Sequence, residues 1–202
     1  MRSFWSEPFL WIHLAGVAAL PIFLGLCLLG LAVGAPLLPV WLEVFLVGAA
    51  GIGPVLWMQW FRPFYIFSIL VVAVKPQNLS NAQQRILLGF KSRLNQGLAL
   101  FVAIVLAVIL WQLYRFAPLA AGVTPFPPQW RLAGLLLAAF AFLASNLFLQ
   151  VPASVMAVLL KPESDFAAMQ PDVLEKIGQD FTIAGWQVDR ILPAFVAEED
   201  GV

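Results

Sequence analysis

Long runs of apolar residues dominate the pattern along this chain. A helix needs about 20 predominantly apolar residues to cross the hydrocarbon layer of a bilayer, and four stretches qualify: residues 9–33, 41–60, 97–116 and 132–160. A backbone in lipid must pair its N–H and C=O groups within the segment, which favours helices. The pattern therefore predicts four membrane-spanning α-helices.

A shorter apolar run, residues 64–74, follows the second span directly after Pro63. It is too short to cross the bilayer, and proline removes a helical hydrogen bond and kinks or ends a helix. The run could continue the second helix past a kink. It could also lie flat along the membrane interface, with Trp57, Trp60 and Tyr65 at the depth of the headgroups. We expect one of these two arrangements rather than a fifth span.

Two polar segments have a helical pattern of their own. Residues 77–96 carry apolar side chains at helical spacing with basic residues among them, which is typical of an amphipathic basic helix. These apolar positions are Ile86, Leu87, Phe90 and Leu94. The tail from residue 161 is polar and mildly acidic. Its stretch PDVLEKIGQDF predicts a short helix, because Pro171 suits a first helical position.

The positive charges predict the topology. Of the 11 Lys and Arg residues, only Arg115 and Arg131 fall on one side of a four-span protein, and the other nine fall on the opposite side. Cytoplasmic loops carry an excess of Lys and Arg. Both termini and the long loop between the second and third spans are therefore expected in the cytoplasm.

Together these patterns predict an all-α polytopic transmembrane bundle, with about four spans arranged as two hairpins and with cytoplasmic amphipathic segments. Residues 1–160 form the transmembrane helical domain. Residues 161–202 form a cytoplasmic tail with one short helix, and we expect the last ten residues to be disordered.

Composition agrees with a membrane protein and narrows the chemistry. Hydrophobic residues make up 62% of the chain and charged residues 11%, against about 45–50% and 25% in soluble domains. The formal net charge is zero, so no basic field favours nucleic acid. With a single histidine and a single cysteine, most metal-dependent and nucleophilic mechanisms are excluded by count. We expect the protein not to be an enzyme.

Two short sequence patterns each occur twice along the chain, and in the same order. GAPLLPVW precedes the second span and GVTPFPPQW precedes the fourth, and SILVVAVKP and SVMAVLLKP follow these spans at the same spacing. We infer two hairpins of like orientation, as in membrane proteins built from repeats. The second span would then run on through Pro63 toward Val74, as the fourth runs through Pro152. Proline-rich loops with flanking Trp and Lys are also ordinary features of membrane hairpins, so a true duplication stays open.

His13 and Glu43 lie inside the predicted spans, where ionisable groups are functional candidates by default. His13 lies about one turn inside the first span. It could ligate the magnesium of a chlorophyll or the iron of a haem, or it could lie in the polar interface. Glu43 lies near the outer end of the second span. It could belong to a polar path for protons or cations, although we expect it to contact headgroups or water.

Polar and small residues mark helix contacts. Asn146 and Gln150 lie four residues apart on one face of the fourth span, and amides in apolar helices commonly form interhelical hydrogen bonds. Gly48, Gly51 and Gly53 give the second span a patch where another backbone can approach closely. This patch predicts close packing within the chain or against a partner.

Four strings carry a resemblance to a known family: WSEPFLWIHLAGVAALPIFLGL, VLWMQWFRPFYIFSILVVAVKP, LWQLYRFAP and FPPQWRLAGLLLAAFAFLASNLFLQVP. Over residues 4–161 the chain resembles the cyanobacterial low-complexity tail membrane proteins. Their name describes a membrane region followed by a tail of biased composition, whereas the tail here is short and not markedly repetitive. The resemblance implies a cyanobacterial thylakoid or plasma membrane and brings no site residues.

These observations lead to one functional expectation and two alternatives. The expected role is a non-catalytic accessory or assembly protein that sits among membrane lipids and packs against a larger, photosynthetic membrane complex. The first alternative is a small transporter or channel subunit with a path past Glu43, Asn146 and Gln150. The second is a pigment or haem protein that uses His13. No cofactor is required by the sequence, although chlorophyll, carotenoid or lipid would suit a membrane bundle.

Overall fold

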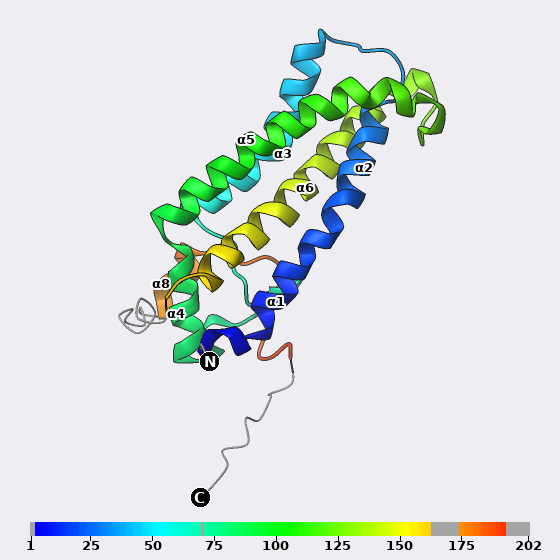
Figure 1. The fold of residues 1–202 in the computed structure, drawn as a ribbon. Helices are drawn as coiled ribbons and strands as arrows, with labels where there is room; N and C mark the ends of the chain where they lie inside the picture. The colour runs from blue at the N-terminus through cyan, green and yellow to red at the C-terminus, as the bar shows by residue number, and fades with distance from the viewer. Residues whose placement is uncertain (1–2, 70, 163–173, 193–202) are drawn as a thin grey trace, which may run out of the picture.

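The computed structural model describes residues 3–69, 71–162 and 174–192 (Figure 1). The helices are η1 Ser3–Ser6, α1 Pro8–Ala15, η2 Gly16–Ala19, α2 Leu20–Leu31, α3 Val40–Phe61, η3 Pro76–Asn78, α4 Asn81–Phe90, α5 Arg93–Phe116, η4 Ala117–Val123, η5 Pro128–Trp130, α6 Arg131–Leu159 and α8 Leu174–Asp180. The strands are β1 Ser68–Ile69, β2 Val72–Val74 and β3 Trp186–Val188.

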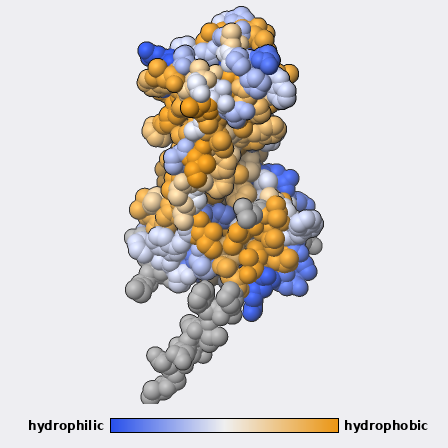
Figure 2. All heavy atoms as spheres, turned by 90° about the vertical axis from the view of Figure 1, so that its right-hand side faces the viewer, coloured by the Kyte–Doolittle hydropathy of each residue, from blue (hydrophilic) through white to orange (hydrophobic). Residues whose placement is uncertain are grey.

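Four of the helical segments are long and apolar enough to cross a membrane, which confirms the predicted all-α four-span bundle. They cover Pro8–Leu31, Val40–Phe61, Arg93–Val123 and Pro128–Leu159, with hydropathies from 1.7 to 2.4. The first span is not a uniform α-helix, because η2 interrupts it just before Pro21, which lacks the N–H that a helical turn needs. Figure 2 shows apolar side chains over the middle of the molecule.

The four spans pack around α6. It contacts α2, α3 and α5, and Figure 1 shows it between α2 on one side and α3 and α5 on the other. A Cβ added at Gly30 would lie 2.5 Å from the Gly134 carbonyl oxygen, so the α2 and α6 backbones approach as closely as glycine allows. The bundle core consists of Cys27, Leu31, Ala32, Val47, Val102, Leu106, Leu110, Ala117, Ala138, Ala141 and Phe142.

A second layer covers the bundle at the end where the first and last described residues lie (Figure 1). We call it the termini-side layer and define it as residues 62–69, 71–92 and 174–192. It contains α4, α8 and a three-stranded sheet in the order β1-β2-β3, in which β1 and β2 pair antiparallel and β2 and β3 pair parallel. The opposite end, formed by residues 32–39 and 117–130, is the loop side.

Residues 64–74 correct one of our expectations. They form neither a bent continuation of the second span nor an interfacial helix, because α3 ends at Phe61 and the chain turns into β1 and β2. Pro63 ends the helix, and the tail then supplies the hydrogen-bond partners that a helix would have supplied. The Tyr65 N–H donates to the Thr182 carbonyl at 3.1 Å, and the Thr182 N–H donates to the Pro63 carbonyl at 3.0 Å.

The same finding corrects the expectation drawn from the repeat. The first six residues of SVMAVLLKP lie within α6, whereas SILVVAVKP contains both β1 and β2. The matching spacing of Ser and Lys-Pro therefore does not reflect matching structure. The two proline-rich loops do meet on the loop side, where Gly34 has a φ of +62° and a Cβ there would overlap the Pro128 carbonyl.

The termini-side layer, together with α1 and the end of α6, has its own buried core, which we call the termini-side core. Its members are Phe9, Leu10, Tyr65, Ile66, Phe67, Ala73, Val74, Leu79, Ile86, Leu87, Phe90, Val155, Val158, Leu159, Ile177 and Phe181. The predicted basic helix contributes as α4, which begins with a capping box between Ser80 and Gln83. The predicted tail helix contributes as α8. Its first predicted residues and the last ten residues of the chain lie outside the described ranges.

Candidate functional site

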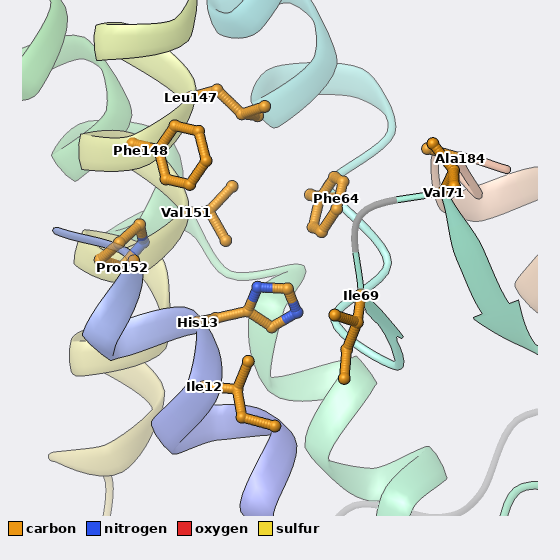
Figure 3. A pocket seen from close by; sticks show the side chains of 11 residues that line it. Ile12, His13, Phe64, Ile69, Val71, Leu147, Phe148, Val151, Pro152 and Ala184 are labelled. Carbon is orange, nitrogen blue, oxygen red and sulfur yellow. The ribbon is translucent and has the colours of Figure 1, made fainter. Parts of the chain in front are cut away.

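A mainly apolar pocket lies where the bundle meets the termini-side layer. Its volume is about 410 Å³, and it is lined by Ile12, His13, Gly16, Phe64, Ile69, Val71, Leu147, Phe148, Val151, Pro152 and Ala184. These residues come from the first span, from α6, and from the hairpin with the adjoining tail. Figure 3 shows His13 between the α6 side chains and the hairpin side chains. His13 is the single ionisable group among the lining residues.

The α6 wall depends on close packing against the first span. A Cβ added at Gly16 would lie 3.3 Å from the Phe148 ring, so the absence of a side chain at residue 16 leaves room for that ring. Phe148 also stacks on Phe23, with 5.2 Å between ring centroids. Pro152 has no N–H, and the Phe148 carbonyl four residues earlier therefore lacks its helical donor.

The hairpin wall is held by the tail. The Trp186 N–H donates to the Val71 carbonyl at 2.8 Å. Gly185 has a φ of +89°, and a Cβ there would overlap the Val71 carbonyl, so only glycine fits this turn. Lys75 pairs with Asp189 at 2.9 Å, and this ammonium group lowers the pKa of the Asp189 carboxyl. The tail thus helps to position the hairpin wall, and Ala184 of the tail lines the pocket directly.

His13 is oriented by the hairpin backbone. Its Nε2 lies 2.7 Å from the Ile66 carbonyl oxygen, and since a carbonyl can only accept, Nε2 carries the hydrogen. The Phe64 ring meets the imidazole edge-on, with 5.5 Å between centroids. The other ring nitrogen, Nδ1, lies on the Val151 side in Figure 3. In the neutral ring, Nδ1 is an acceptor that faces the pocket.

Glu43 lies elsewhere, on the loop side, in an ion pair with Arg131. The Glu43 side chain is fully buried and that of Arg131 is 3% exposed. Arg131 also donates to the Leu31 and Val33 carbonyls, at 2.6 and 2.9 Å, and the Leu37 N–H donates to Glu43 at 2.8 Å. The expectation that Glu43 contacts headgroups or water is therefore wrong. Its carboxylate fastens the first proline-rich loop to α3 and α6.

The amides of the fourth span are buried but do not form the expected network. Asn146 donates to the Phe142 carbonyl of its own helix at 2.9 Å, and its Oδ1 has no partner among the described residues. Gln150 is 1% exposed, and neither of its amide atoms has a partner there. Gln59 of α3 is also buried with an unpaired Nε2. No interhelical hydrogen bond is seen for these side chains within the described part of the chain.

The glycine patch of the second span divides between two faces of α3. A Cβ at Gly51 would lie 2.4 Å from the Phe142 ring, so Gly51 packs inward against α6. Gly48 faces Leu110 of α5 at 3.3 Å. Gly53 has nothing within 4 Å and lies on the exposed face. The patch thus serves packing within the chain at two positions and is open at the third.

Several important residues escaped the sequence reasoning. From the sequence, Arg131 is treated only as a charge of the loop. An arginine at the start of one apolar helix and a glutamate at the start of another nevertheless suggest an ion pair, because ionisable residues in membrane helices usually pair with one another. The Gly30–Gly134 contact joins glycines 104 residues apart, which no local pattern reveals. The pocket likewise joins side chains of the first span, of the segment after α3, of α6 and of the tail, which lie far apart in the sequence.

The described residues contain no group of three His, Cys, Asp or Glu side chains placed to hold a metal ion. No curated protein and no solved structure matches the chain. The model of the low-complexity tail membrane protein-like family matches residues 6–193. Because this match covers nearly the whole chain, including both packed layers, the protein belongs to the low-complexity tail membrane protein-like family.

Proposed function

We propose that this integral membrane protein is a non-catalytic accessory or assembly protein that docks onto a larger membrane complex through the exposed face of α3. The observation that carries the proposal is the shape of that face. Large exposed side chains stand at its two ends, and small ones fill its middle. The large residues are Trp41, Phe45, Leu46, Trp57, Trp60 and Phe61, and the small ones are Ala49, Ala50, Gly53 and Pro54.

Small residues matter here because of the solvent. Lipid tails are as apolar as leucine, so helices in a bilayer associate by close packing, and small residues four apart allow backbones to approach. Ala49 and Gly53 have this spacing on the exposed side of α3. A helix from another protein could lie against them, with the flanking tryptophan and phenylalanine rings on either side.

The exposed face of α5 offers a contrast within the same molecule. Large side chains follow one another along it: Leu94, Leu100, Phe101, Ile104, Val108, Trp111 and Phe116. Gly97 and Ala107 interrupt this row singly. Such a surface is adequate for contact with lipid, which adapts its shape. The row of small residues on α3 has no such explanation within the described chain, and this difference supports a protein partner.

The orientation and the membrane are part of the proposal. Eight of the described Lys and Arg residues lie on the termini side: Arg62, Lys75, Arg85, Lys91, Arg93, Lys161, Lys176 and Arg190. The loop side has Arg115 and Arg131, and Arg131 is neutralised by Glu43. By the positive-inside rule the termini face the cytoplasm. A photosynthetic membrane complex, in a thylakoid or plasma membrane, is the partner that the family resemblance favours.

Purification of a tagged full-length copy from its native membranes in mild detergent tests this proposal. We expect stoichiometric subunits of a larger membrane complex, identified by mass spectrometry. Gly53→Leu should release them, because the new side chain fills the exposed depression. Gly97→Leu is the matched control, since both glycines have nothing within 4 Å. A wild-type protein recovered alone would contradict the proposal.

The buried amides favour one second candidate, a small transporter or channel subunit. Unpaired amide atoms at Gln59, Asn146 and Gln150 would be satisfied by water or a polar solute. Against this, Glu43 is held by Arg131 and is not free to line a path. Modification of Gln150→Cys by a charged thiol reagent, in a Cys27→Ser background, would favour transport. Protection of that thiol in the membrane would contradict it.

A further inference from the structure

We infer that the pocket at His13 binds an uncharged lipid that carries a hydrocarbon chain and a free hydroxyl group. This goes beyond the proposed docking role, because the pocket lies on the first span, α6 and the hairpin rather than on the exposed face of α3.

The lining calls for a hydrocarbon chain. Ten of the eleven lining residues are apolar or glycine, and the volume of about 410 Å³ falls in the range of about 300–1,000 Å³ typical of small-molecule sites. Ile12 and Val71, on opposite walls, are 38% and 57% exposed. The pocket is therefore open at its edge, near the start of the first span, where a chain can enter from the membrane.

The polar group of the pocket requires a hydrogen-bond donor on the ligand. His13 Nε2 is engaged with the Ile66 carbonyl, which leaves Nδ1 as an acceptor that faces the pocket. The other described lining residues are apolar or glycine and have no side-chain donor for Nδ1. A hydroxyl group on the ligand can supply that donor.

The charges exclude ionic headgroups from the pocket. None of the described residues that line it is a Lys, Arg, Asp or Glu, so a phosphate or a carboxylate would be desolvated without a partner, which is costly. A neutral headgroup with a hydroxyl, such as that of a diacylglycerol or a prenol, avoids this cost. A diacylglycerol and a prenol both have the neutral hydroxyl group that the pocket can bind, and they differ in their hydrocarbon chains.

The test uses two pairs of probes with the delipidated full-length protein in detergent. Geranylgeraniol is compared with its methyl ether, and 1,2-dioleoylglycerol with its 3-O-methyl ether. Binding is read from the concentration dependence of the rise in unfolding temperature. We expect the alcohol of at least one pair to bind about five- to tenfold more tightly than its ether, as one net hydrogen bond predicts. The pair that binds identifies the chain.

Variants locate the binding. Val71→Trp should abolish the shift by filling the mouth of the pocket, whereas Val108→Trp on α5 should leave it unchanged, and both valines are 57% exposed. His13→Phe should bind alcohol and ether equally. Equal binding of alcohol and ether by the wild type, unchanged binding in Val71→Trp, or no binding of either pair would overturn the inference. A coloured preparation that loses its colour in His13→Ala would also overturn it, because His13 would then be a metal ligand.

Discussion

The bundle core and the termini-side core share α6 but are built from residues of different size. The bundle core contains four alanines and one aromatic residue, Phe142. The termini-side core contains one alanine and five aromatic residues, namely Phe9, Tyr65, Phe67, Phe90 and Phe181. Burial of the Tyr65 phenol, whose hydroxyl donates to the Val74 carbonyl at 2.9 Å, raises its pKa.

The two cores differ because their side chains are surrounded by different solvents before they pack: lipid for the bundle core, and water for residues outside the hydrocarbon. Helices in lipid gain little from burying large apolar surface, so they are held by close backbone contacts such as Gly30–Gly134. Outside the hydrocarbon, removal of apolar surface from water stabilises by about 25 cal/mol per Å², and large side chains become effective. Leu87 and the other termini-side core residues that lie outside the four candidate spans are therefore expected to follow the packing rule of soluble cores, and the bundle core is expected to follow that of membrane helices.

The largest expected effect comes from the one buried ion pair of the bundle. Arg131→Met should destabilise the protein by about 3–5 kcal/mol, because it leaves the buried Glu43 carboxylate without its counter-charge. Reversible unfolding in mixed micelles measures the change. Adding Glu43→Gln to this variant should restore much of the loss. If Arg131→Met alone were as stable as the wild type, the ion pair would not contribute to the free energy of unfolding.

A matched pair of leucines separates the two packing rules. Leu87 in the termini-side core is 1% exposed, and Leu106 in the bundle core is 0% exposed. Leu87→Ala should cost about 2–5 kcal/mol, as in soluble cores. Leu106→Ala should cost less, because its reference state is lipid rather than water. The same unfolding assay compares them, and a larger loss for Leu106→Ala would reverse the comparison.

Small-to-large changes should show the opposite preference. Gly134→Leu should destabilise by about 1–3 kcal/mol or prevent assembly of the bundle, since a Cβ there would lie 2.6 Å from both the Gly30 carbonyl oxygen and the Val33 side chain. Gly53→Leu, in open space, should leave the unfolding free energy close to the wild-type value. If both variants unfold like the wild type, close α2–α6 contact is not what holds the bundle.

The smallest expected effect concerns the docked tail. Lys75 lowers the folded pKa of Asp189, so this contact stabilises docking above the ordinary Asp pKa of about 3.9. The contribution is lost as the pH falls through the lowered folded value. Spin labels at Gln77 and Gln187, in a Cys27→Ser background, should therefore move apart only in acid. Asp189→Asn should remove this pH dependence. If the spin labels of that variant still move apart at the same pH, a group other than Asp189 is responsible.

Sequence reasoning succeeded for the bundle because hydropathy reports length and solvent directly. It failed at residues 64–74 because an apolar run of that length suits a kinked helix, an interfacial helix or a buried hairpin equally well. The deciding partner, Thr182, lies more than 100 residues later. The same limit hid the pocket: His13 was visible from the sequence, but the Ile66 carbonyl that orients it and the Phe148 face opposite it depend on how distant segments pack.

We propose that the exposed face of α3 contacts a protein and that the exposed face of α5 contacts lipid. A photo-crosslinking benzoylphenylalanine placed at Trp57 or at Phe101 in native membranes tests it directly, because these aromatic side chains are 67% and 61% exposed. We predict one discrete heavier product from position 57 and lipid adducts alone from position 101. Lipid adducts alone from both positions, or the same protein product from both, would contradict a protein contact specific to α3.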